Sequence, residues 1–247
     1  MPTTVAVAQA APIFLDRDAT IDKACALIKE AGANNAALLL FPETFVPAYP
    51  DWVWRLPAWS DGRFVRRLYD QAVTVPSPAT ERIGAAARES AMYVAIGVNE
   101  LDGGTLYNTL LYFDPQGELV VRHRKLMPTG GERTVWGYGD GSTLGVVPTP
   151  FGVVGGLICW ENYMPLARAA MYGQGVEIYL APTWDNDDTW IATLQHIAKE
   201  GRCYVLGVAP GRPPCASCGP RPAWGWGDPC RPACQPPSTP PHSRSPA

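Results

Sequence analysis

A carboxylate, an ammonium and a thiol each close an apolar or strand-like run of the sequence. Glu43 ends "AALLLFPE", Lys125 ends "VVRHRK" and Cys159 ends "VGGLIC". A carboxylate can accept a thiol proton, while an ammonium favours the thiolate and stabilises negative charge that develops on a substrate. Because strand ends converge on clefts in layered α/β proteins, the three residues are candidates for one nucleophilic site.

Each of these residues also has a purely structural interpretation. Free cysteines are among the most buried residue types, so Cys159 alone is more readily a core residue than a nucleophile. The basic run that contains Lys125 is typical of a solvated strand edge. A carboxylate directly after an apolar strand is harder to explain, because it loses hydration unless it is paired or used. Only the combination of the three residues indicates a site.

A histidine offers a different base for the same thiol. His123 lies two positions before Lys125 and so points to the same face of an extended strand. Histidine is a common partner of a nucleophilic thiol, so a Cys-His hydrolase that uses His123 stays open at this point. A serine hydrolase is not supported, because the sequence lacks the G-x-S-x-G elbow.

The elements that must position these residues follow from the apolar periodicity of the chain. Alternating or continuously apolar runs predict strands over residues 4–10, 36–43, 92–100, 105–114, 118–126, 152–159, 176–181 and 203–209. Helical spacing predicts helices over 21–28, from Ser77–Pro78 onwards, and over 164–173 and 188–200. The alternation of strands and helices predicts a layered α/β architecture with a mixed sheet that includes antiparallel meanders.

Length and composition limit the class of protein. The chain has 247 residues, of which 47% are hydrophobic, so it can fill a sizeable core. A net charge of -3 without a basic block leaves no electrostatic footprint for nucleic acid or an anionic membrane surface. The sequence has no apolar run of membrane-spanning length and no signal-peptide pattern at its start. We therefore expect a cytoplasmic protein of enzyme size with neither nucleic acid nor a membrane as partner.

Three longer motifs resemble the nitrilases of the carbon-nitrogen hydrolase superfamily. They are "FPETFVPAYPDW", "HRKLMPTGGERTVWGYGDGS" and "GGLICWENYMPLARAAMYGQGVEIYLAPTWD", and the similarity runs from about residue 4 to 209. The segment "CWEN" is similar to the nitrilase branch, whereas amidase branches tend to carry a Tyr-Asp pair there. The resemblance implies a four-layer α-β-β-α sandwich, no metal or organic cofactor, and assembly into homo-oligomers, either dimers or larger spirals.

The resemblance also assigns roles to the candidate residues. Cys159 would attack a nitrile carbon to form a thioimidate, Glu43 would act as general base and acid, and Lys125 would stabilise developing charge. Glu132 matches the second glutamate of the family, which would position the lysine and the substrate. The predicted function is therefore hydrolysis of an organic nitrile to the carboxylic acid and ammonia. The alternatives are an amidase or cyanide-processing relative with the same triad, and an inactive, truncated family member.

Substrate-binding residues are predicted from the aromatic side chains near these motifs. The backbone N–H of Trp160 is a candidate second donor to the developing charge, as is usual for the residue after such a nucleophile. An apolar pocket suited to aryl or arylalkyl nitriles would be lined by Tyr49, Trp136, Trp160 and Trp184. The structural alternative is that tryptophans in a chain with nine of them mostly pack the core.

The composition changes abruptly after residue 210. Residues 211–247 are rich in Pro and Cys and contain no Leu, Ile, Val, Phe, Met or Tyr. We therefore predict a carbon-nitrogen hydrolase domain over 1–210, truncated at its C-terminal end, and a disordered tail over 211–247. The bias of the tail suggests a shifted reading frame in GC-rich DNA. The rival hypothesis is a zinc site formed by the four cysteines Cys215, Cys218, Cys230 and Cys234.

Overall fold

The computed structural model describes residues 2–185 and 187–211 of the chain. The predicted disorder of the tail and the alternative zinc site both fall on residues 212–247. These two predictions lie outside the described residues.

The first sheet has five strands in sequential order. The first three are parallel, and two antiparallel hairpin connections then complete the sheet. Its strands are β1 (Thr4–Val7), β2 (Ala36–Leu40), β3 (Tyr93–Asp102), β4 (Thr105–Phe113) and β5 (Leu119–Arg124). The predicted mixture of parallel strands and an antiparallel meander is therefore confirmed.

The second sheet has four strands. It comprises β6 (Val146–Thr149), β7 (Gly152–Gly156), β8 (Ile178–Pro182) and β9 (Tyr204–Val208), in that order. β6 pairs with β7 in antiparallel fashion, and the remaining pairs are parallel. β6 was not predicted, because it is short and contains Pro148, which is tolerated in a strand at the edge of a sheet.

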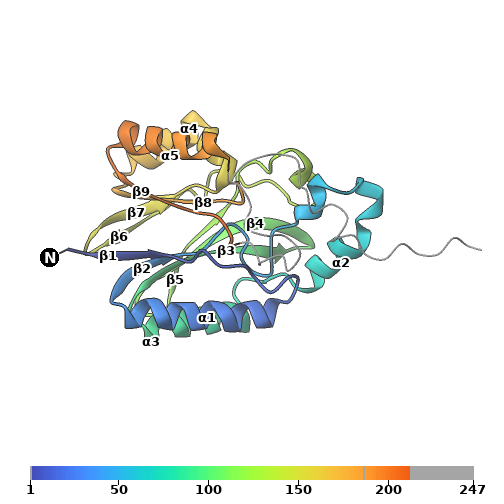
Figure 1. Ribbon diagram of the computed structural model, residues 1–247, viewed down its shortest axis with the longest axis horizontal. Coiled ribbons are helices and arrows are strands. Elements are labelled where there is room, and N and C mark those ends of the chain that lie inside the picture. Colours follow the sequence, from blue (N-terminus) through green and yellow to red (C-terminus); the bar gives the residue numbers. More distant parts are fainter. Residues whose placement is uncertain (1, 186, 212–247) are drawn as a thin grey trace, which may run out of the picture. The chain divides into compact units, whose positions relative to one another are not determined.

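The helices cover the outer faces of the two sheets (Figure 1). α1 (Arg17–Ala33) and α3 (Pro78–Glu89) pack on the first sheet, and α4 (Pro165–Gly173) and α5 (Asp188–Gly201) pack on the second. A separate apolar cluster joins the inner faces of the two sheets. The predicted four-layer α-β-β-α sandwich is thereby confirmed. α2 (Gly62–Asp70) was not predicted, and it contributes Leu68 to a further cluster.

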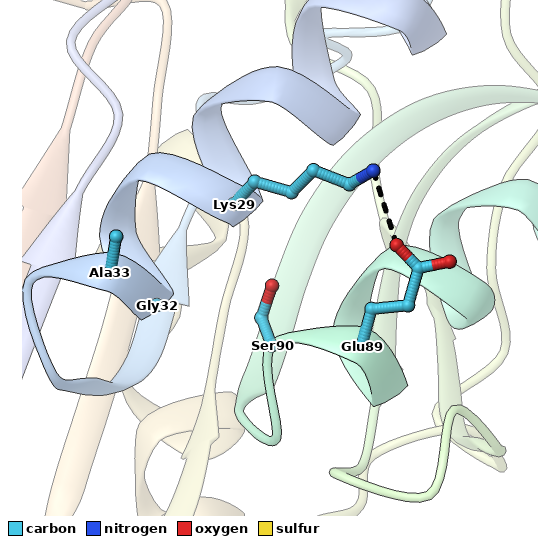
Figure 2. A pocket seen from close by; sticks show the side chains of 5 residues that line it. All are labelled: Lys29, Gly32, Ala33, Glu89 and Ser90. Carbon is cyan, nitrogen blue, oxygen red and sulfur yellow. Dashed lines mark ion pairs between the residues drawn. The ribbon is translucent and has the colours of Figure 1, made fainter.

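The two helices on the first sheet approach each other closely at their C-terminal ends. A Cβ on Gly32 of α1 would lie 2.8 Å from the Cβ of Ser90, which follows α3. Figure 2 shows the hollow at this contact, where Lys29 and Glu89 form an ion pair of 3.1 Å across the two helices. Both side chains of the pair are largely exposed, so the glycine contact contributes more to the helix spacing than the ion pair does.

Short 3-10 helices lie in several of the connections between the strands and the longer helices. They are η1 (Asp51–Trp54), η2 (Ala58–Ser60), η3 (Gly130–Thr134) and η4 (Cys159–Tyr163). None was predicted, because single turns of this kind have no apolar periodicity of their own. The strand predicted over 152–159 is correspondingly too long, since β7 ends at Gly156 and Cys159 begins η4. In the described part of the chain, no helix is both long and apolar enough to span a membrane.

Gly97 on β3 lets the segment after β2 lie directly against the sheet. A Cβ at this position would lie 2.3 Å from the backbone nitrogen of Thr44 and 2.5 Å from the carbonyl oxygen of Pro42. The backbone N–H of Val46 donates to the Gly97 carbonyl at 3.1 Å. This close approach positions Glu43, which stands between Pro42 and Thr44.

We predict that Gly97→Ala lowers the free energy of unfolding by about 1–3 kcal/mol, because the new methyl group meets backbone atoms that cannot rotate away. Thermal or denaturant unfolding measures this change. Gly173→Ala is the matched control, since no atom lies within 4 Å of a Cβ at Gly173. Equal stability of the two variants would contradict the close approach.

Candidate active site

Glu43 lies buried in the segment that follows β2, with both carboxylate oxygens engaged. Oε1 accepts hydrogen bonds from Lys125 Nζ and Asn108 Nδ2, each at 2.7 Å. Oε2 accepts from the backbone N–H of Trp184 at 2.8 Å. The carboxylate is thus oriented by donors from three separate parts of the chain, which offsets the cost of burying it.

Lys125 follows β5 directly and lies between two carboxylates. Its Nζ donates to Glu43 at 2.7 Å and to Glu132 Oε2 at 2.8 Å, and all three side chains are buried. Glu132 belongs to η3 and caps its own helix, because Oε2 also accepts from the Thr129 backbone N–H at 2.6 Å. Its other oxygen accepts from the Tyr49 hydroxyl at 2.6 Å. Glu132, which the resemblance places beside the lysine, therefore contacts Lys125 directly.

The charges of this cluster shift the proton affinities of its members. Burial raises the pKa of Glu43, although the ion pair with Lys125 opposes the rise. Burial alone would lower the pKa of Lys125, but Glu43, the Cys159 sulfur and Glu132 together raise it well above its ordinary value. The lysine is therefore a permanent cation, while Glu43 is a carboxylate with an increased tendency to take up a proton.

Cys159 begins η4 in the left-handed backbone region, with φ of 51°. A non-glycine residue in this conformation is uncommon and is often held at a functional site by its surroundings. Its side chain is buried, and the Thr183 hydroxyl donates to Sγ at 3.1 Å. Burial raises the pKa of the thiol far above its usual range; Glu43 adds to the rise and Lys125 opposes it. The resting group is therefore a thiol that needs a base.

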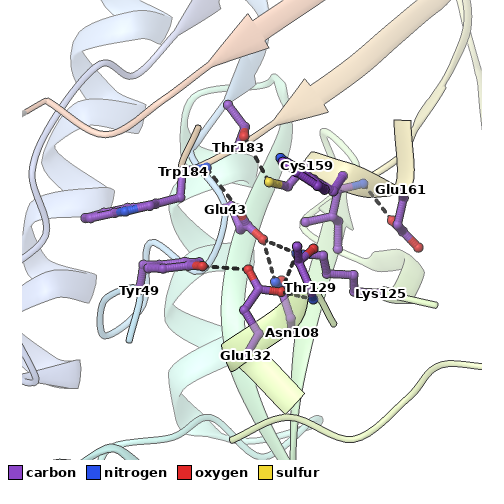
Figure 3. Close-up of polar contacts among 12 residues, drawn as sticks. Glu43, Tyr49, Asn108, Lys125, Thr129, Glu132, Cys159, Glu161, Thr183 and Trp184 are labelled. Carbon is purple, nitrogen blue, oxygen red and sulfur yellow. Dashed lines mark hydrogen bonds and ion pairs between the residues drawn. The ribbon is translucent and has the colours of Figure 1, made fainter. Parts of the chain in front are cut away.

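Two consecutive residues after β8 join the thiol to the carboxylate. Thr183 contacts the sulfur, and the backbone of Trp184 contacts Glu43. Figure 3 shows Glu43, Lys125 and Cys159 together below the end of this strand, with the Lys125 side chain reaching both glutamates from the side opposite Tyr49. The tertiary structure thus brings Glu43, Lys125 and Cys159 together.

The turn that carries Cys159 is fastened by the two polar residues that end "CWEN". Asn162 donates to the carbonyl oxygens of Cys159 and Leu157, at 2.7 and 3.0 Å. Glu161 is buried and accepts from the backbone N–H of Ile158 at 2.7 Å. These bonds hold the backbone of the turn, which begins at Cys159 in the left-handed region.

His123 lies beside this turn, but both of its ring nitrogens have other partners. Nε2 contacts the Glu161 carboxylate at 3.1 and 3.2 Å, and Nδ1 contacts the Thr143 hydroxyl at 3.1 Å. Neither nitrogen is therefore free to accept the thiol proton. This geometry favours Glu43 over His123 as the base for Cys159.

Three of the four predicted aromatic residues form one cluster beside Glu132. Tyr49 stacks on Trp184 with ring centroids 4.7 Å apart and meets Trp136 edge-on at 5.6 Å. Tyr49 and Trp136 are almost fully buried, and the Trp136 indole donates to Asn99 at 2.9 Å. Trp160 lies apart with half of its surface exposed, and its indole donates to Asp185 at 3.0 Å. Their predicted contacts with substrate stay predictions.

Sequence reasoning missed four residues of this site: Asn108, Glu161, Asn162 and Thr183. Asn108 sits inside an otherwise unremarkable strand, "TLYNTLLYF", where one amide gives no signal. Thr183 follows a strand and differs little from any residue of a turn. The consecutive Glu161 and Asn162 carried a signal, because polar residues directly after an apolar strand need partners. Within the described ranges, no group of three or more His, Cys, Asp or Glu side chains is placed to hold a metal ion.

Comparison with known proteins gives a family match over most of the chain. The carbon-nitrogen hydrolase family model matches residues 4–212. The chain is 53% identical over 209 residues to an aliphatic nitrilase of Sinorhizobium fredii, covering 81% of this chain and 67% of that protein. It is 48% identical over 206 residues to a bifunctional nitrilase/nitrile hydratase of Nicotiana tabacum, with coverage of 81% and 59%. The chain thus spans about two thirds or less of the length of these relatives.

Solved structures share the fold at much lower identity. An amidase from Nesterenkonia sp. superposes with a TM-score of 0.66 at 20% identity, covering 82% of this chain and 74% of that one. Nit3 of Saccharomyces cerevisiae, a member of branch 10 of the nitrilase superfamily, superposes with a TM-score of 0.69 at 20% identity, with coverage of 85% and 77%. At this identity the likeness concerns the fold alone.

We predict that Thr183→Val makes the Cys159 thiol less reactive, because a hydrogen bond donated to sulfur favours the thiolate and lowers the thiol pKa. Losing a bond of this kind is expected to slow alkylation by iodoacetamide at pH 8 by about 3–10-fold and to shift the rate–pH profile to higher pH. The rate is followed by mass spectrometry of the peptide that contains Cys159. Thr183→Ser keeps the donor and should react like the wild type; equal rates for the two variants would contradict the assigned contact.

Proposed function

The chain belongs to the carbon-nitrogen hydrolase family, and from this membership we propose that it hydrolyses an organic nitrile to the carboxylic acid and ammonia. The observation that carries the proposal is the buried arrangement in which Lys125 bonds Glu43 while Thr183 and Trp184 hold the thiol and the carboxylate side by side. The name of the S. fredii relative, an aliphatic nitrilase, supports a nitrile as substrate.

The first chemical step moves one proton and forms one bond. Glu43 takes the proton of Cys159, so the charge of the pair does not change, and the raised pKa of Glu43 suits it to hold that proton. The thiolate then adds to the nitrile carbon, and the nitrogen, which gains the electron pair of the broken π bond, receives the proton to give a thioimidate. Lys125 and the backbone N–H of Trp160 are the proposed stabilisers of negative charge on this nitrogen.

Two water molecules complete the reaction. The first adds to the thioimidate carbon, with Glu43 as general base, and the collapse of the adduct expels ammonia and leaves a thioester. The second cleaves the thioester to release the carboxylic acid and restore the thiol. Glu132 is proposed to hold Lys125 in place through both steps, because it bonds Nζ at 2.8 Å and is itself fixed by Tyr49 and Thr129.

The remaining assignments extend the proposal to binding and assembly. We assign Trp184, Tyr49, Trp136 and Trp160 to the substrate-binding side of the site. Exposed apolar side chains on the outer helices, Leu166 on α4 and Ile191 on α5, support a homo-oligomer. The three described cysteines, Cys25, Cys159 and Cys203, are free thiols, which supports the reducing cytoplasm as the place of action.

We predict that Cys159→Ala lowers ammonia release from nitriles by at least about 10³-fold, because the covalent intermediate cannot form. Ammonia and the organic product are measured with a panel of aliphatic, aryl and arylaceto nitriles and with the matching amides. Cys203→Ala is the control, since Cys203 is also a buried free thiol but contacts the carbonyl of Ile197.

Each outcome of this panel decides something. Cys159-dependent ammonia from amides alone would replace the nitrilase by an amidase with the same triad. An amide as the main product from nitriles would indicate that the adduct expels the thiol rather than ammonia. No Cys159-dependent ammonia from any substrate would overturn the enzymatic proposal for this chain.

A further inference from the structure

One buried carboxylate joins the backbone next to the lysine to the backbone next to the nucleophile. Glu161 Oε1 accepts from the N–H of Leu126 at 2.6 Å, and Oε2 accepts from the N–H of Ile158 at 2.7 Å. Leu126 follows Lys125 in the chain, and Ile158 precedes Cys159. Figure 3 shows Glu161 on the far side of Cys159 and Lys125 from Glu43.

His123 supplies the third donor to this carboxylate. Its ring is buried, and Nε2 lies 3.1 and 3.2 Å from the two oxygens of Glu161. The Thr143 hydroxyl lies 3.1 Å from His123 Nδ1 and also accepts from the backbone N–H of Arg124 at 3.3 Å. Because a carboxylate only accepts hydrogen bonds, Nε2 is the protonated nitrogen that faces Glu161.

The Glu161 side chain is held rigidly because both of its carboxylate oxygens accept hydrogen bonds. A buried carboxylate is costly unless donors surround it, and here three N–H groups do so. Two of these donors belong to the backbone and cannot rotate, so the carboxylate sets the distance between two chain segments that are otherwise far apart in sequence. The segments belong to different sheets, since β5 precedes Lys125 and β7 precedes Cys159.

We propose that Glu161, held by His123, is a positioning residue that sets the separation between the Lys125 ammonium and the Cys159 sulfur. The inference deepens the proposed function and rests on it for its catalytic meaning, because thiolate formation depends on the distance to the cation. Neither Glu161 nor His123 touches the reacting atoms in this assignment. Small displacements of reacting groups lower the reaction rate strongly. Glu161 and His123, which we call the clamp, therefore contribute to catalysis only by fixing this distance.

The test is a double-mutant cycle that reads the reactivity of the thiol instead of turnover. The full chain is prepared as wild type, Lys125→Gln, Glu161→Gln and the double variant, and alkylation of Cys159 by iodoacetamide is followed across pH by peptide mass spectrometry. In the wild-type background, loss of the lysine charge should slow alkylation at pH 8 by about 10-fold or more. In the Glu161→Gln background, the same loss should slow it by less than about 3-fold, because the cation is no longer held at its distance.

Multiplicative effects of the two substitutions would overturn the inference, because Glu161 would then act on the fold and not on the spacing. Glu100→Gln is the matched control: Glu100 is equally buried and bonds Arg124, which precedes Lys125, as well as Arg122 and Thr109, but it contacts no neighbour of Cys159 and so cannot join the two residues. This variant should lose stability yet leave the effect of Lys125→Gln undiminished. If Glu161→Gln melts far below the wild type, His123→Gln replaces it in the cycle, and the same loss of coupling is required.

The readout separates this inference from the proposed function. Iodoacetamide reports the Lys125–Cys159 coupling whether or not the chain hydrolyses a nitrile. A coupled cycle without ammonia release would overturn the nitrilase and keep the clamp. Ammonia release with an uncoupled cycle would keep the nitrilase and overturn the clamp.

Discussion

The buried ion cluster of Lys125 with Glu43 and Glu132 is the constraint on which the rest of the site depends. One ammonium between two carboxylates can stay buried only if every oxygen finds a donor, and each does: Asn108 and Trp184 serve Glu43, while Tyr49 and Thr129 serve Glu132. Burial is the main cause of the raised pKa of the Cys159 thiol, and the negative charge of Glu43 adds to the rise, so the thiol keeps its proton at rest. The cluster therefore places both a carboxylate and an ammonium near the thiol.

The fold places the main groups of the site just beyond the ends of strands. Glu43 stands after β2, Lys125 after β5, Cys159 after β7 and Thr183 after β8, so each strand end provides one group. The short turns beyond the strands then aim the side chains, most visibly at Cys159, whose left-handed backbone is held by Asn162 and Glu161. The rigid sheets fix where each side chain of the site begins, and the buried polar contacts fix its final orientation.

The layered fold was predicted from the sequence with few errors, for identifiable reasons. Buried strands and amphipathic helices have a regular apolar period, so β3, α4 and α5 were found close to their true bounds, whereas the strand predicted over 36–43 runs three residues past the end of β2. α2, β6 and the 3-10 turns were missed because short, partly polar segments carry no period. The strand that leads to Cys159 was predicted too long for a different reason. The apolar Leu157 and Ile158 continue the run after the strand has ended.

The sequence alone determined which residue types occur, in what order, and that they stand at strand ends. The apolar pattern and the chemical identity of residues are local properties of the chain. Which candidate base is engaged elsewhere became visible only in the tertiary structure. His123 and Glu43 were both candidates along the sequence, and the fold engages both nitrogens of the histidine with Glu161 and Thr143 while it brings Glu43 onto Lys125. Such pairings join residues many positions apart, and hydrogen bonds between them depend on distances that no local pattern encodes.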